Sequence, residues 1–175
     1  MELGIYHEFP VLPGRSQAEC FAAGFDIVDA SEEYGLDVMW LAELHFDKRR
    51  ALAASPLVLG TAIAARTERI RIGTSVQVLP LANPLRIAEE AATLDHVSKG
   101  RLIFGVGRSG VVKTYEALNI AYSESKDREM SVWKSFNAPG GKTICPTRAS
   151  FTTSKTLRWC RSRCNNRRPK SASRR

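Results

Sequence analysis

Short apolar runs alternate along the chain with longer amphipathic segments. The short length and β-branched content of the runs predict buried parallel strands. These strands are expected at residues 2–6, 37–42, 70–79 and 102–106. The segments between them place apolar side chains at helical spacing, which predicts helices. The helices are expected at residues 17–34, 56–66 and 85–97.

Local signals mark where the predicted helices begin and end. Ser16 precedes the first helix, and Glu19 follows three residues later, which is the spacing of a capping box. Gly35 stands directly after the same helix, where a residue with positive φ commonly ends it. Lys99 and Gly100 end the third helix in the same way. The chain therefore has the order strand, helix, strand, helix, strand, helix, strand.

Strands joined by helices in this order predict an α/β fold with a parallel sheet and right-handed crossovers. Both a doubly wound sheet and a (β/α)8 barrel fit this order. A dinucleotide-binding doubly wound sheet needs a glycine-rich turn after its first strand, and residues 7–10 read HEFP instead. The barrel is therefore favoured. Barrel enzymes place functional groups after their strands, here at residues 7–8, 43–46, 75–79 and 107–109.

Charge divides the chain into two unlike parts. Residues 131–175 hold 12 of the 26 Lys and Arg residues and none of the 18 Asp and Glu residues. The preceding part therefore carries a net charge of −4, although the whole chain carries +8. The basic tail is expected to be disordered, and nucleic-acid binding through phosphate contacts is a weaker alternative for it. A lone CxxxC spacing between Cys160 and Cys164 is a weak zinc signal, so no metal site is predicted.

The amino terminus lacks the basic start and long apolar run of a signal peptide. No stretch of about 18 apolar residues is long enough to span a membrane. These features predict a cytoplasmic protein with reduced thiols and no membrane partner.

Three stretches resemble the bacterial luciferase-like, flavin-dependent monooxygenase family. They are residues 35–46 (GLDVMWLAELHF), 72–90 (IGTSVQVLPLANPLRIAEE) and 93–108 (TLDHVSKGRLIFGVGR). The resemblance covers roughly residues 1–129. It implies a partial (β/α)8 TIM barrel made of the first four βα units, with residues 130–175 as a separate basic tail.

The resemblance also implies which residues surround a flavin. Glu43 matches the family's acidic residue after the second strand and is a candidate cofactor-binding residue, with an exposed loop carboxylate as the alternative. The family has two histidines after this position. Here Leu44 replaces the first, which leaves His45 as the candidate catalytic residue or a neutral structural histidine. His7, at the end of the first strand, is a weaker candidate for the same site.

Four further residues are candidate cofactor contacts on the same basis. Ser75 and Val76 match the position of a non-proline cis peptide beneath the flavin ring. Gly107 stands where luciferases have a reactive cysteine. Arg108 follows it and is expected to pair with the flavin phosphate, unless it is an ordinary surface arginine.

The implied activity is oxidation of an organic small-molecule substrate by O2 and reduced flavin. The implied cofactor is reduced FMN, with the deazaflavin F420 as the alternative found in some relatives. A flavin reductase is expected as the donor of FMNH2, and a homo-oligomer is an open expectation.

A complete barrel needs about 250 residues, and residues 131–175 do not continue the pattern of the first half. A one-base shift of reading frame near residues 129–131 offers an explanation. Residues 158–173 (RWCRSRCNNRRPKSAS), written in permitted codons and read one base out of frame, give VVPKPVQQPPPKIRV. That segment resembles the family's approach to its fifth strand. An inactive frameshifted fragment is therefore the alternative to a working enzyme.

Overall fold

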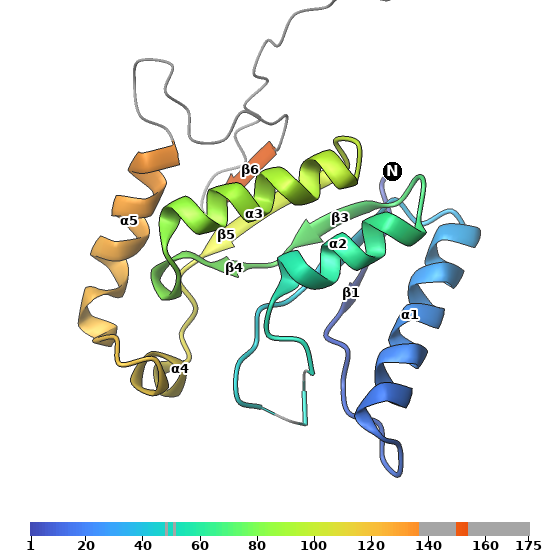
Figure 1. Ribbon diagram of the computed structural model, residues 1–175, viewed down its shortest axis with the longest axis horizontal. Coiled ribbons are helices and arrows are strands. Elements are labelled where there is room, and N and C mark those ends of the chain that lie inside the picture. The colour runs from blue at the N-terminus through green and yellow to red at the C-terminus, as the bar shows by residue number, and fades with distance from the viewer. Residues whose placement is uncertain (48, 51, 137–149, 154–175) are drawn as a thin grey trace, which may run out of the picture.

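Within the part of the chain that the structure describes, six short strands form one parallel sheet. The computed structural model describes residues 1–47, 49–50, 52–136 and 150–153. The strands are β1 (Gly4–His7), β2 (Val38–Leu41), β3 (Arg71–Thr74), β4 (Gln77–Val78), β5 (Leu102–Gly107) and β6 (Ser150–Thr153). β1 pairs with β2, β2 with β3, and both β3 and β4 with β5, while β6 also pairs with β5. The predicted α/β class and the parallel sheet are confirmed (Figure 1).

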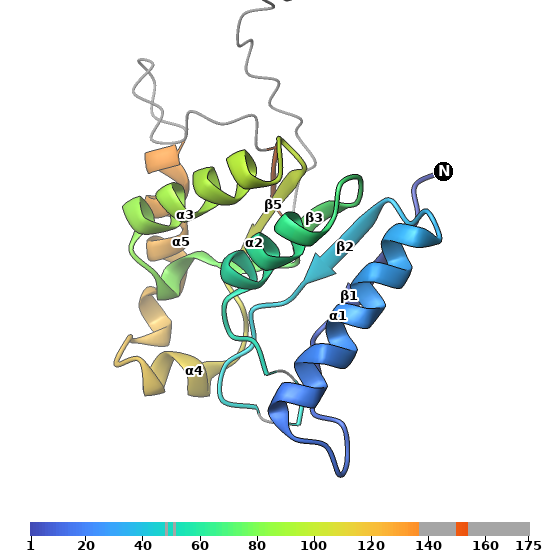
Figure 2. The ribbon, with the colours of Figure 1, turned by 45° about the vertical axis from the view of Figure 1, so that its right-hand side comes forward.

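Three long helices pack against one face of this sheet (Figures 1 and 2). They are α1 (Gln17–Glu33), α2 (Pro56–Arg66) and α3 (Pro84–Val97). Between the two layers lies one apolar cluster that joins strand residues such as Met39 and Ile72 to helix residues such as Ile63 and Leu94. Burying each of these side chains contributes about 1.5–3 kcal/mol to the stability of the fold.

Smaller elements follow the third and fourth predicted strands. The 3-10 helix η1 (Leu79–Leu81) precedes α3, and α4 (Val112–Ala117), η2 (Tyr122–Glu124) and α5 (Ser125–Phe136) follow β5. The helix α5 packs against η1 and α3, where the side chain of Val132 joins the main core.

The local signals for helix ends are confirmed. The Ser16 hydroxyl accepts from the Glu19 backbone N–H, and the Glu19 carboxylate accepts from the Ser16 backbone N–H at 2.8 Å. Gly35 has a φ of 80° and Gly100 a φ of 83°, both in the region where glycine has no steric penalty. These ends are set by residues close in sequence, which is why they can be predicted without tertiary information.

The predicted strand over residues 70–79 is wrong in one respect, because it is not continuous. A cis peptide bond between Ser75 and Val76 separates β3 from β4, and residues 79–81 form η1. β3 pairs with the first half of β5 and β4 with its second half, so the two strands occupy one place in the sheet. Alternating β-branched residues indicate an extended backbone, but they carry no signal for a cis bond within it.

The side chain of Trp40 lies across glycines of both neighbouring strands. A Cβ atom at Gly73 would stand 2.3 Å from the indole ring, and one at Gly4 would stand 3.0 Å from its nitrogen. Met39 and Ile72, the preceding residues of β2 and β3, belong to the core under the helices. Because successive strand residues point to opposite faces, Trp40 lies on the face away from the helices.

Part of the predicted tail has regular structure. Helix α5 continues across residue 130 to Phe136, and residues 150–153 form β6 beside β5. The remaining tail residues, including Cys145, Cys160 and Cys164, lie outside the described residues, so the predictions about disorder, zinc and nucleic-acid binding stay untested. Among the described helices, none is both long and apolar enough to cross a membrane.

Candidate active site at the carboxyl ends of the strands

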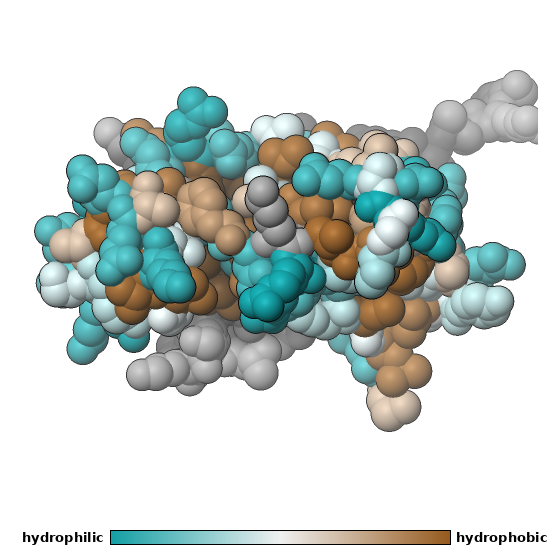
Figure 3. All heavy atoms as spheres, turned by 90° about the horizontal axis from the view of Figure 1, so that it is seen from below, coloured by the Kyte–Doolittle hydropathy of each residue, from teal (hydrophilic) through white to brown (hydrophobic). Residues whose placement is uncertain are grey.

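The candidate site residues gather where the parallel strands end. Glu43 and His45 follow β2, Gln77 lies in β4, and Gly107 is the last residue of β5. Parallel strands bring their carboxyl ends to one edge of a sheet, which is the lower end of the molecule in Figures 1 and 2. Exposed apolar residues such as Phe46 and Val111 lie in the loops that follow these strands, and apolar and polar areas alternate across this end (Figure 3).

The Glu43 carboxylate is the centre of a buried polar network. Its side chain is only 5% exposed, and its Oε1 lies 2.8 Å from Nε2 of His45. Its Oε2 accepts from the backbone N–H of Val78 at 2.6 Å and from the side-chain amide of Gln77. Donors on both oxygens stabilise a charge that has little access to water. Glu43 is therefore a buried carboxylate that links β2 to β4, and the alternative of an exposed loop carboxylate is excluded.

The contact with Glu43 also fixes the orientation of His45. A carboxylate oxygen only accepts, so the facing nitrogen Nε2 carries the proton of this hydrogen bond. In a neutral ring the other nitrogen, Nδ1, is then left as an acceptor. The His45 side chain, which carries Nδ1, is 20% exposed and therefore only partly buried. A histidine held in this way by a carboxylate is the arrangement that general bases use.

Gln77 is a member of the site that the sequence analysis missed. It is 5% exposed, its amide nitrogen donates to Glu43, and its amide oxygen has no partner among the described residues. The available signal was a single polar residue in an otherwise apolar strand, at positions 76–79 (VQVL). Its partner lies 34 residues earlier, which no local pattern reveals.

The segments predicted to flank the flavin ring are in contact with one another. The structure has a cis peptide between Ser75 and Val76, at the position that the family resemblance gives for one. Gly107 is buried beside Val76, and a Cβ atom there would stand 2.9 Å from the valine Cγ2. The absence of a side chain at Gly107 therefore lets β4 and β5 approach closely at their ends.

Arg108 points toward the elements that follow β5. Its Nη1 donates to the Ser125 hydroxyl at 3.2 Å, and its guanidinium lies over the Tyr122 ring at 5.2 Å. The Tyr115 hydroxyl donates to the Arg108 carbonyl, and burial raises the pKa of that hydroxyl. Arg108 is exposed and keeps most of its five N–H groups outside the described hydrogen bonds, so it is able to bind an anion.

None of the described contacts joins His7 to the Glu43 network. Its ring is 4.6 Å from the Phe9 ring, and its buried Nε2 has no hydrogen-bond partner within the described residues. Burial lowers the pKa of His7, and the nearby Glu8 opposes this shift. Glu8 itself accepts from Arg50 at 2.5 Å, which ties the loop after β1 to the loop after β2.

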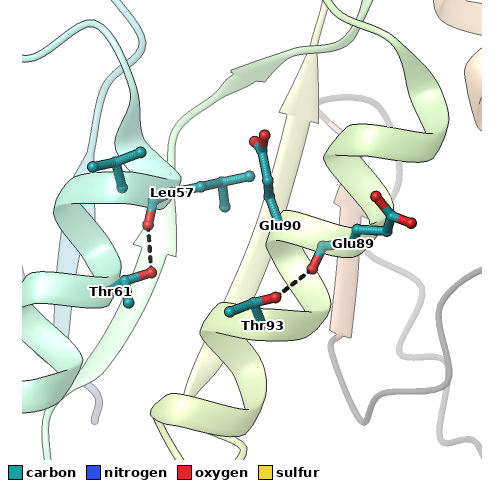
Figure 4. Close-up of a pocket in the computed structure, with 6 residues that line it drawn as sticks. Leu57, Thr61, Glu89, Glu90 and Thr93 are labelled. Carbon is teal, nitrogen blue, oxygen red and sulfur yellow. Dashed lines mark hydrogen bonds between the residues drawn. The ribbon is translucent and has the colours of Figure 1, made fainter.

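A groove on the outer helical layer is not part of this site. It lies between α2 and α3 and has a volume of about 180 Å³. The hydroxyls of Thr61 and Thr93 in it donate to carbonyls of their own helices, those of Leu57 and Glu89 (Figure 4). In the described part of the chain, no three His, Cys, Asp or Glu side chains are grouped as metal ligands.

The parallel strands, their helical cover and the polar groups at the strand ends define part of a (β/α)-barrel enzyme. A family model described as luciferase-like monooxygenase matches residues 1–129. The chain belongs to this family, and the predicted membership is confirmed.

Individual relatives agree with this membership. The alkanal monooxygenase alpha chain of the Kryptophanaron alfredi symbiont is 33% identical over 121 residues, which cover 69% of this chain and 33% of the relative. The crystal structure of monooxygenase RslO1 from Streptomyces bottropensis superimposes with a TM-score of 0.72 at 29% identity, over 77% of this chain and 41% of that one.

A third similarity concerns the fold alone. The oxygenating constituent of 3,6-diketocamphane monooxygenase from Pseudomonas putida, solved in complex with FMN, has a TM-score of 0.70 at 22% identity, over 77% of this chain and 38% of that one. The chain spans about a third of the length of the curated relatives it matches. The roles predicted for Glu43, His45, Ser75–Val76, Gly107 and Arg108 stay predictions.

Proposed function

We propose that this chain binds reduced FMN at the carboxyl ends of β2, β4 and β5 and carries out a luciferase-like monooxygenation. The observation that carries the proposal is the Glu43 network, a buried carboxylate that orients His45 at the strand ends of a family member. The amide oxygen of Gln77 is buried and has no partner among the described residues. Leaving a buried acceptor without a hydrogen bond costs free energy, so this oxygen supports a ligand at this site. Gly107 has no side chain, which lets this end of β5 lie close to the side chain of Val76 in the cis peptide.

Each residue has a definite part in the proposal. Reduced flavin, when bound, supplies the electrons with which O2 is reduced. Arg108 pairs with the flavin phosphate, for which a guanidinium offers two parallel donors. Ser75, Val76 and Gly107 support the ring, and Glu43 holds His45 so that its free ring nitrogen takes or returns a proton.

An alkanal is the substrate class to test first, because a relative that is 33% identical is an alkanal monooxygenase. The balanced reaction converts alkanal, O2 and FMNH2 into a carboxylic acid, water and FMN. A flavin reductase in the cytoplasm supplies FMNH2.

Anaerobic titration of the purified chain with dithionite-reduced FMN tests flavin binding. Turnover is tested by measuring the carboxylic acid formed from decanal in the presence of O2, NADH and a flavin reductase. Saturable binding with acid formation supports the whole proposal. Binding without acid supports the alternative of an inactive fragment that keeps its flavin site. Absence of binding to reduced FMN contradicts the FMN site, and a parallel titration with reduced F420 then decides whether a deazaflavin takes its place.

A further inference from the structure

Gln77 has two chemically different ends that face different surroundings. Its amide nitrogen donates to Oε2 of Glu43, the same oxygen that accepts from the Val78 backbone N–H. Because the facing oxygen of Glu43 is an acceptor, the amide is oriented with its nitrogen toward Glu43 and its oxygen away from it. That oxygen is buried and accepts no hydrogen bond from any described residue.

An unpaired carbonyl oxygen in a residue that is only 5% exposed is unusual. Leaving a buried acceptor unpaired costs about 1–3 kcal/mol, and native structures contain few such atoms. An apolar residue of similar length, such as methionine, would avoid this cost at a strand position. The amide therefore makes sense if its oxygen acquires a donor when the site is filled.

The position of Gln77 in the sheet places it among the proposed flavin contacts. It is the residue after Val76, and it is registered with Val106 on β5, so its neighbour Val78 is registered with Gly107. Its donor end reaches across to Glu43 after β2. Gln77 thus follows the cis peptide directly, pairs with β5 near its end, and donates to the carboxylate that contacts His45.

We propose that Gln77 is a positioning residue of the flavin site, whose amide nitrogen orients Glu43 and whose amide oxygen accepts a hydrogen bond from an N–H group of the bound flavin. This inference rests on the function proposed above. The flavin ring carries N–H groups of its own. The hydrogen bond to the Gln77 oxygen therefore does not require a donor from the substrate. The role is separate from proton transfer, because an amide neither takes nor releases a proton near neutral pH.

The first test compares Gln77→Met with Gln17→Met in the full chain. Methionine keeps the length of the side chain but removes both ends of the amide, and Gln17 is an exposed glutamine at the start of α1. We expect the Kd for reduced FMN to rise about tenfold in Gln77→Met and to stay unchanged in Gln17→Met. Equal affinity of Gln77→Met and the unmodified chain, with both folded by circular dichroism, overturns the inference while leaving FMN binding itself established.

The second test separates positioning from simple support of the fold. Gln77→Glu sets two carboxylates against each other, and adding Glu43→Gln exchanges the amide and the carboxylate so that one hydrogen bond between them is restored. We expect the exchanged pair to recover most of the thermal stability lost in Gln77→Glu but to keep an FMN Kd at least about tenfold above that of the unmodified chain. Recovery of both stability and FMN affinity shows a purely structural pair and overturns the proposal.

Discussion

Two polar networks lie at opposite ends of the same sheet, and they are built in different ways. Before β5, the Arg101 guanidinium uses all five of its N–H groups, on the carbonyls of Ala64, Thr67, Ile70 and Ser98 and on the Thr67 hydroxyl. After β2, the Glu43 network keeps the Gln77 oxygen without a described partner and leaves a ring nitrogen of His45 outside the described hydrogen bonds. The first network is complete within itself, whereas the second has atoms left to bind something else.

This difference suggests a division of roles, in which the amino ends of the strands serve stability and their carboxyl ends serve ligand binding. A saturated network at the amino ends of parallel strands can only hold elements together, in this case the end of α2, the turn after α3 and the start of β3. A network with spare acceptors at the carboxyl ends is the place where a barrel enzyme binds its ligand. Substitutions at Arg101, Glu43, His45 and His7 test this division, and their expected effects on the free energy of unfolding decrease in that order.

Arg101→Met is expected to cause the largest loss of stability. It leaves four backbone carbonyls without their donor, which should lower the free energy of unfolding by at least about 3 kcal/mol. For a chain of this size the melting temperature should fall by about 10 °C. Urea denaturation measures the change, and Arg86→Met, which alters an exposed arginine on α3, should stay within about 0.5 kcal/mol. A loss in Arg101→Met no larger than in this control would contradict a structural role for Arg101.

Glu43→Ala is expected to affect both stability and binding. The backbone N–H of Val78 and the amide of Gln77 lose their acceptor, at a cost of about 2 kcal/mol. The Kd for reduced FMN should rise at least about tenfold, whereas Arg101→Met, studied at a temperature where it is folded, should keep its affinity. Glu89→Ala on the exposed face of α3 is the control. Unchanged FMN affinity in Glu43→Ala would remove this carboxylate from the binding site.

His45→Gln is expected to separate turnover from stability. The side chain is partly exposed and makes one described hydrogen bond, so the free energy of unfolding should change by less than about 1 kcal/mol. Loss of a general base typically lowers the rate about 100-fold or more, which acid formation from decanal would show. His96→Gln, at an exposed position of α3, controls for removal of a histidine. An equal rate in His45→Gln and His96→Gln would exclude proton transfer by His45.

His7 is expected to contribute the smallest effect, a dependence of stability on pH. Burial lowers the pKa of His7 in the folded chain, so the unfolded chain binds the proton more readily. Its contribution to stability is therefore complete above about pH 6.5, the usual pKa of histidine, and is lost as the pH falls below that value. Urea denaturation at about pH 7.5 and about pH 5.5, on either side of that value, should show a smaller decline for His7→Gln than for the unmodified chain. Parallel declines would show that His7 titrates as an ordinary exposed histidine.

The sequence predicted those features whose cause lies nearby in the chain. The capping box of Ser16 and Glu19 and the positive φ of Gly35 depend on a few consecutive residues, and the strands and helices follow from periodicity. The prediction of a cis peptide at Ser75–Val76 came from the resemblance to a family, because no pattern of residue types predicts such a bond.

The site itself could be predicted only in part. The rule that function gathers after barrel strands pointed to residues 43–46, and the family resemblance singled out Glu43 and His45 among them. The structure brings these two side chains together. Gln77 was not predicted as a site residue. It is recognised by its contact with Glu43, 34 residues earlier, and by an amide oxygen without a described partner, and both features exist only in three dimensions. The partners of Arg101 lie on α2, in the turns beside it and in its own turn, so the full set of its contacts also exists only in three dimensions.

The indole of Trp40 gives the sheet an internal optical reporter. The ring fills the space left by Gly4 on one neighbouring strand and Gly73 on the other, so its surroundings exist only while β1, β2 and β3 are paired. Separation of any of the three strands exposes this ring to water and shifts its fluorescence to longer wavelength. A Trp40→Phe variant, subtracted from the unmodified chain, would therefore record the assembly of these strands independently of the helices that cover their other face.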